Sequence, residues 1–130
     1  MKIAVGTDDK QHIRKGHFGD SSGYFIFVVE GQTIVGESFR HNPNSDDAAE
    51  GGRHHHGKVN AIWSTLNDVD VFIGRSMGRE SVPKLIERGV LPILTKIEDA
   101  REGVQAFLRG EKEKFLYFDP IQKKFTPYKK

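Results

Sequence analysis

The sequence predicts an α/β protein with a mixed, five-stranded sheet, the element order β-β-β-α-β-α-β-α and helices on both faces. Apolar runs of strand length occur at 2–7, 24–29, 33–40, 71–73 and 90–94. Apolar residues at helical spacing follow each of the last three runs. Two strand–helix units in succession imply parallel strands with right-handed crossovers, and the hairpin of the second and third runs adds an antiparallel strand.

The first three strands differ in how much of their surface they should bury. The run at 2–7 is short and ends at two acidic residues. The run at 24–29 is apolar on both faces, which is typical of a central strand covered on both sides. A turn at 30–32 leads into 33–40, where Gly36 interrupts the apolar pattern. This strand is therefore predicted nearer a sheet edge.

Two helices are predicted on either side of the fourth strand. The first should pack an apolar stripe on the sheet, formed by Val59, Ile62, Trp63 and Leu66. The second follows the fourth strand and should bury Val82, Leu85 and Ile86. Gly89 is predicted as its left-handed C-cap.

The last strand and the last helix are predicted from a proline and a capping pattern. Pro92 lies inside the run at 90–94, which indicates an edge strand or a bulge because proline cannot donate to a sheet ladder. Thr95 and Glu98 have the spacing of a capping box, and Gly110 should close the helix that follows. The buried face of this helix is expected at Ala100, Val104, Phe107 and Leu108.

The chain of 130 residues is expected to form one domain over 1–110 with a C-terminal extension over 111–130. The extension carries an aromatic run at 115–118. We interpret this run as an added strand or a strap packed on the domain, with a dimer contact as the alternative. The protein is accordingly expected to be a monomer or a homodimer.

Composition excludes several classes of site. There is no cysteine, so disulfides, thiolate zinc sites and cysteine-ligated iron–sulfur clusters are ruled out. Lys and Arg number 20 against 18 Asp and Glu, a net charge of +2 that gives no reason to expect nucleic acid or an acidic membrane as partner. No apolar stretch approaches the length of a membrane span or of a signal peptide, so a cytoplasmic location is predicted.

The turn after the fourth strand is the first candidate site, and it consists of Gly74, Arg75, Ser76, Met77 and Gly78. Its two glycines would let a ligand approach the backbone, and the start of the next helix would point unpaired N–H groups at an anion. Ligands of such sheets bind beyond the carboxyl ends of parallel strands, here Thr7-Asp8 and this turn. An ordinary strand-to-helix connection fits the same pattern, and Arg75 fits either an anion partner or a surface residue.

Histidine supplies the second candidate. His54, His55 and His56 are consecutive in a long polar segment without apolar periodicity, just before the first predicted helix. Neutral imidazole is the commonest metal ligand, and the helix dipole at this position favours the neutral form. The triplet therefore indicates metal binding, with a solvated polar loop as the alternative.

Met77 is the third candidate. A methionine at an exposed turn has no core to fill, and its thioether is a soft ligand suited to copper(I) or to a sulfide cluster. The alternative is that Met77 folds back as a cap on the following helix. The pattern leaves both interpretations open.

Several of these segments together resemble the dinitrogenase iron-molybdenum cofactor biosynthesis family. The resemblance rests on 1–9, on His17-Phe18-Gly19-Asp20 before Tyr24-Phe25, on the histidine-bearing loop, and on 70–74 with 76–78. It covers Met1 to about Gly110 and implies a ribonuclease H-like fold. It also implies that the protein holds a metal–sulfur cluster: the iron-molybdenum cofactor, its precursor, or another molybdenum, iron or copper cluster.

By the same resemblance, the metal ligands are expected among His17, His54, His55, His56 and Met77, with the 74–78 amides on the anionic side of the cluster. A preformed cluster brings its own sulfides, so a carrier without cysteine needs only one or two such contacts. No catalysis is implied, and the expected partner is a cofactor-assembly or recipient protein. Arg75 departs from the family, which commonly has glycine there, and so does the tail after Gly110.

Two other functions are alternatives to a carrier. A metal-dependent nuclease needs converging carboxylates; Asp8 and Asp9 end the first strand, but Asp70 begins its own strand and should lie at the opposite end. A module that binds a phosphorylated metabolite or a partner protein would use the same helix terminus as a cluster. The histidines favour the metal.

Overall fold

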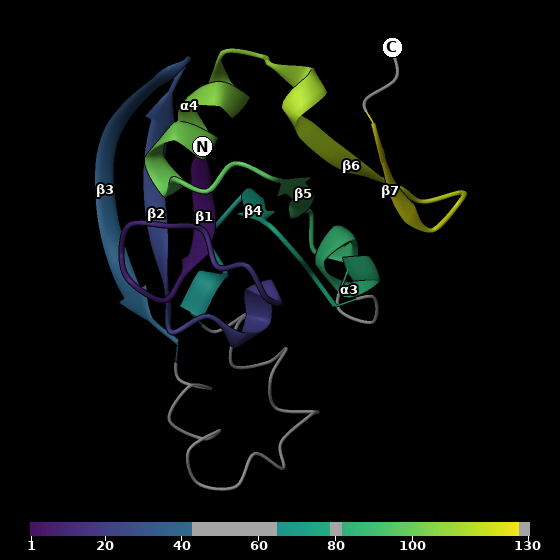
Figure 1. Cartoon of the computed structure of the whole chain (residues 1–130), viewed down its shortest axis with the longest axis horizontal. Helices are drawn as coiled ribbons and strands as arrows, with labels where there is room; N and C mark the ends of the chain where they lie inside the picture. Colours follow the sequence, from purple (N-terminus) through teal and green to yellow (C-terminus); the bar gives the residue numbers. More distant parts are fainter. Residues whose placement is uncertain (43–64, 79–81, 128–130) are drawn as a thin grey trace, which may run out of the picture.

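The computed structural model describes residues 1–42, 65–78 and 82–127, and these form one mixed sheet with helices packed on it (Figure 1). The strands follow one another across the sheet in the order β3-β2-β1-β4-β5-β6-β7. Their bounds are β1 Lys2–Thr7, β2 Gly23–Glu30, β3 Thr33–His41, β4 Val71–Gly74, β5 Leu91–Thr95, β6 Phe115–Asp119 and β7 Lys124–Pro127. All five predicted strands are present, but the count of five is wrong, because two further strands from the tail extend the sheet.

The sheet is mixed, as predicted. β1, β4 and β5 are parallel neighbours, while β2 and β3 pair antiparallel on one side and β6 and β7 on the other. β2 lies between β1 and β3, and β3 is at an edge, which confirms the positions expected for both. The likeness to ribonuclease H stays a prediction.

Alternation along the central strands sends side chains to two cores. Ile3 and Val5 of β1 join the cluster under α4 (Ala100–Leu108), whereas Ala4 between them joins the cluster under α3 (Val82–Glu87). Helices on both faces are thereby confirmed. In α3, Val82 and Leu85 are buried as expected, but Ile86 is 38% exposed.

Pro92 does not mark an edge strand, and that prediction is wrong. β5 lies between β4 and β6, and Pro92 is aligned with Phe72 of β4. The pairing of β5 with β6 begins only at Ile93. The proline is tolerated because it precedes the ladder with β6, so no ladder hydrogen bond on that side needs its missing N–H group.

The N-cap of α4 is also not the predicted one. Asp99, not Thr95, caps the helix, and its carboxylate accepts a hydrogen bond from Glu102 N at 2.8 Å. Thr95 Oγ1 instead donates to Lys114 O at 2.8 Å and so fixes the segment that enters β6. At the other ends, Gly89 and Gly110 have φ of 81° and 77°, the left-handed conformation expected after a helix.

The tail continues the sheet as a hairpin, which confirms the added strand among the predicted alternatives. After a short 3₁₀ turn, η2 (Lys112–Lys114), β6 pairs antiparallel with β5 and β7 pairs with β6. Phe115 is 2% exposed and its ring lies edge-on to that of Phe107 at 5.7 Å. None of the helices in the described part of the chain is long and apolar enough to span a membrane.

Candidate functional site

The carboxyl ends of β1 and β4 lie side by side, as the sequence predicted. The two strands are parallel neighbours in a register that aligns Val5 with Ile73. The segment after β1 returns to this edge as a short 3₁₀ helix, η1 (Phe18–Asp20). There the backbone of His17 forms a parallel bridge with that of Ser76, and Phe18 N donates to Ser76 O at 2.8 Å.

The side chain of His17 is held against the same serine. Ser76 Oγ lies 3.2 Å from His17 Nδ1, and both groups are accessible to solvent. The tautomer with a proton on Nδ1 donates to the hydroxyl and leaves the lone pair of Nε2 free to bind a metal. The structure thus brings two predicted site residues together across 59 positions of the chain.

Met77 follows Ser76 and has a different environment from the one predicted. It is partly exposed, but it packs against the core cluster that contains Ala4, Phe18 and Phe72. The expectation that it has no core to contact is therefore wrong. The side chain of Met77 contacts this core, and it also lines an open groove between α3 and the β6–β7 hairpin.

The space left by Gly74 is filled by the protein itself. A Cβ atom at this position would lie 3.3 Å from Phe18 Cδ2 and 3.6 Å from Met77 Cε. We predicted that this glycine lets a ligand reach the backbone; in the structure it lets the Phe18 ring pack closely. Phe18 in turn stacks on Phe72 with ring centroids 4.5 Å apart, so the residue next to His17 is anchored in the core.

A buried network of hydrogen bonds holds the segment that directly follows His17, and it was not predicted from the sequence. Asn42 is fully buried and its side-chain amide donates to Gly19 O at 3.1 Å and Ser21 O at 2.7 Å. Tyr24 Oη and Ser21 Oγ both donate to Phe18 O, at 3.1 and 2.7 Å. Burial raises the pKa of Tyr24, so its phenol stays protonated and remains a donor.

Other parts of the predicted site fall wholly or partly outside the described residues. His54, His55 and His56 lie outside the described residues, and so does the segment just before α3. The predicted anion site at the start of that helix, with Gly78, stays a prediction. Arg75 is partly exposed on the turn.

The acidic residues after β1 are engaged locally. Asp8 pairs with Arg14 Nη1 at 2.6 Å and accepts a hydrogen bond from Ser22 N. Asp9 accepts from His12, whose Nδ1 lies 2.6 Å from its carboxylate. Hydrogen bonds from the backbone and the side chain of His12 lower the pKa of Asp9, and the Asp9 carboxylate raises the pKa of His12.

Asp70 lies at the opposite end of the sheet, as the sequence predicted. Its carboxylate accepts a hydrogen bond from Lys2 N, at the start of β1, at 2.8 Å. Within residues 1–42, 65–78 and 82–127, no group of three or more His, Asp or Glu is placed to hold a metal ion. The described carboxylates therefore do not converge as a two-metal site requires.

These features define a small α/β domain with a histidine and a methionine at one edge of its parallel strands. Residues 1–110 match the model of the family described as "Dinitrogenase iron-molybdenum cofactor", and the chain belongs to this family. The expected membership is confirmed over the predicted range. No curated protein matches the chain.

Solved structures share the fold at low identity. A provisionally named NifB protein from Thermotoga is 17% identical, with a TM-score of 0.66 and 98% of each chain covered. The apo form of the orange protein from Desulfovibrio gigas is 18% identical, with a TM-score of 0.62 over 85% of this chain and 88% of that one. A provisionally named dinitrogenase from Methanocaldococcus jannaschii is 14% identical, with a TM-score of 0.60 over 85% and 90%.

Proposed function

We propose that the protein binds and carries a preassembled metal–sulfur cluster, without catalysis. The cargo is the iron-molybdenum cofactor, its precursor, or another molybdenum, iron or copper cluster. The observation that carries this proposal is the position of His17, which is fixed by Ser76 next to Met77 where β1 and β4 end. Family membership supports the class of cargo.

The two side chains suit a cluster that arrives with its own sulfides. In the required tautomer His17 offers one imidazole nitrogen to a metal, and Met77 offers a soft thioether. A preformed cluster needs few such ligands, which is consistent with a chain that has no cysteine. The side chains act by binding and orienting the cargo, and no bond of the cluster has to be made or broken.

The histidine triplet is consistent with the proposal because of the contacts of the residue that precedes its segment. Asn42, the last described residue before it, is hydrogen-bonded to Gly19 and Ser21 in the segment that carries His17. The residue that ends the described chain before the triplet is thus tied to the segment that follows His17. We propose that one of His54, His55 and His56 supplies a further ligand, and that a cofactor-assembly or recipient protein exchanges the cargo.

Isolation of the untagged protein from its native host under anaerobic conditions tests this function. We expect visible absorption from a bound cluster, and iron or molybdenum together with inorganic sulfide in amounts close to the protein concentration. An untagged protein is essential, because a histidine triplet takes up nickel or copper during metal-affinity purification. Colourless protein without sulfide, from cells that make the cluster, would contradict the proposal.

A further inference from the structure

A groove of about 730 Å³ runs between α3 and the β6–β7 hairpin. We call it the hairpin groove, and its apolar lining includes Met77, Val82, Pro83, Ile86, Phe118 and Phe125. Figure 1 shows the hairpin next to α3, at the end of the sheet away from β3. Ile86 is 38% exposed here although it lies on the core side of its helical pattern. The groove therefore presents an apolar surface that is accessible among the described residues.

The β6–β7 hairpin, which forms the wall of the groove opposite α3, is held together by contacts of its own residues. Phe118 and Phe125 face each other across the hairpin with ring centroids 5.5 Å apart. Asp119 Oδ1 accepts hydrogen bonds from Ile121 N at 2.8 Å and Gln122 N at 3.2 Å, and Asp119 O accepts from Lys123 N at 2.7 Å. The carboxylate of Asp119 is thus used to close the turn between β6 and β7.

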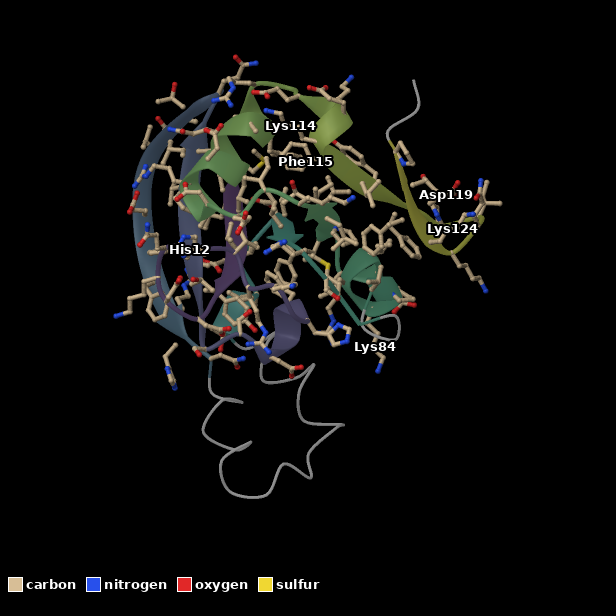
Figure 2. All side chains as sticks on the ribbon, viewed as in Figure 1. His12, Lys84, Lys114, Phe115, Asp119 and Lys124 are labelled. Atoms are coloured by element: carbon tan, nitrogen blue, oxygen red, sulfur yellow. The ribbon has the colours of Figure 1, made fainter. Side chains whose placement is uncertain are left out.

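The charged side chains at the groove indicate which kind of partner would bind there. Lys123 and Lys124 line it, and Glu87 is the one acidic residue among the described residues that line it. Figure 2 shows Lys124 on the hairpin and Lys84 on α3, and Lys84 is exposed as well. A second copy would bring the same lysines to the interface and be repelled, whereas a segment with carboxylates would be attracted.

The edge of the sheet makes strand addition to β7 unfavourable. β7 carries Lys124 at its start and Pro127 at its end. Lysine and proline on an edge strand both discourage pairing with another strand. A partner is therefore expected to fill the groove beside the hairpin and not to extend the sheet.

The groove also adjoins the proposed cargo site. Met77 lines the groove, and its neighbour Ser76 holds His17. The hairpin lies after residue 110, outside the range that the family model matches, whereas Met77 and α3 lie inside it. A partner seated in the groove would contact the same methionine as the cargo.

We propose that the hairpin groove is the docking surface for a partner protein, which inserts an apolar segment flanked by Asp or Glu. We further assign this contact to the transfer of cargo at Met77, and that assignment rests on the proposed function. The recognition itself depends only on the apolar walls and on Lys123 and Lys124.

Selection of random displayed peptides on the full-length protein tests the docking surface. We expect the enriched peptides to combine apolar residues with an excess of Asp and Glu, and to bind less tightly as salt is raised. Ile86→Asp and Lys124→Glu should each weaken the best peptide about tenfold or more, a usual size for an interface hot spot. Lys96→Glu, at an exposed lysine that does not line the groove, should leave its affinity unchanged.

Several results would overturn the docking surface. They are no enriched peptide, enriched peptides without an acidic excess, or binding that neither variant changes. Self-association in sedimentation that Ile86→Asp abolishes would show that a second copy occupies the groove. Thermal melting of each variant shows whether it is folded; if Ile86→Asp is not, Lys124→Glu decides alone.

The experiments distinguish a failure of the carrier function from a failure of the docking surface. Both groove variants should bind cluster like the wild type. Wild-type protein that binds acidic peptides but no cluster would disprove the carrier function and leave the docking surface intact.

Discussion

Ser76 Oγ lies 3.2 Å from His17 Nδ1, and this contact joins the loop after β1 to the turn after β4. The backbones of the same two residues are bridged, so the imidazole is oriented by both main chain and side chain. A hydrogen bond to the second ring nitrogen of a metal-binding histidine sets its tautomer and its direction. The candidate site is therefore preorganised at His17, whose partner Ser76 directly precedes Met77 in the turn.

Ser76→Ala should weaken cargo binding without unfolding the protein. The substitution removes the hydroxyl that fixes His17, and loss of such a partner usually costs about tenfold in metal affinity. Because the contact is exposed, the melting temperature should stay within a few degrees of wild type. Anaerobic titration with a synthetic molybdenum–iron–sulfur cluster measures the first effect, and Ser38→Ala on β3 is the matched control. Equal affinity of all three proteins would show that Ser76 does not orient a ligand.

Asn42→Ala should be among the most destabilising substitutions in the domain. The side chain is fully buried and donates hydrogen bonds to Gly19 O and Ser21 O, which would lose their partner. We expect a loss of about 2 to 4 kcal/mol in the free energy of unfolding, measured by urea denaturation. Tyr24→Phe, which leaves Phe18 O bonded to Ser21, should cost only about 1 kcal/mol. If Asn42→Ala lost no more free energy of unfolding than Tyr24→Phe, the hydrogen bonds of Asn42 would not be what stabilises the loop after β1.

Gly6→Ala should destabilise the fold and displace the segment that carries His17. A Cβ atom at Gly6 would lie 2.3 Å from Ser21 Oγ and 3.2 Å from the Phe18 ring, so one of them must move. We expect a loss of about 1 to 3 kcal/mol, typical of overpacking. Gly36→Ala is the control, since its nearest neighbour would be Val28 at 3.8 Å. Urea denaturation of both variants gives the comparison, and equal losses would refute the packing argument.

The pair of His12 and Asp9 should make stability depend on pH. The pKa of His12 is raised above its ordinary 6.5 by Asp9, with smaller contributions from Asp99 and Glu98. The stabilisation by protonated His12 is thus fully present below pH 6.5 and is lost as pH rises through the raised pKa. The pKa of Asp9 is lowered, so its contribution is present above pH 3.8 and is lost as pH falls through the lowered value.

NMR titration of the imidazole tests this pair directly. In wild type the His12 signals should titrate above pH 6.5, and in Asp9→Asn they should return to about 6.5. The free energy of unfolding of wild type should fall across the His12 titration, and that of Asp9→Asn should not. Unchanged titration in Asp9→Asn would exclude this ion pair as the cause. His12 and its neighbours are exposed, so the effect on stability should be small.

Most of the fold could be predicted because apolar periodicity and turn residues report it locally. β1 to β5 and the capping glycines at 89 and 110 follow from such patterns. The edge position predicted from Pro92 was wrong because the sequence shows that an N–H donor is missing, but not at which residue the pairing with the neighbouring strand begins. The number of strands was wrong because the aromatic run in β6 suits a strand and a strap equally.

The candidate site was predictable in part. His17 and Ser76 were identified as site residues, and the sheet register brings them together. Asn42 was missed because a lone asparagine at a strand end has no sequence signal; its importance comes from partners that the fold assembles. Gly74 was assigned to a ligand because sequence cannot show that the Phe18 ring takes the space above it.

Anaerobic titration of the synthetic cluster into wild type, His17→Ala, Met77→Ala and His12→Ala tests the central claim most directly. His12, labelled in Figure 2, is the matched control. It is an exposed histidine in the loop that also carries His17, and its ring is paired with Asp9. We expect tight binding by wild type and His12→Ala, and binding at least about tenfold weaker by His17→Ala and Met77→Ala. Equal binding by all four proteins would contradict the assigned site.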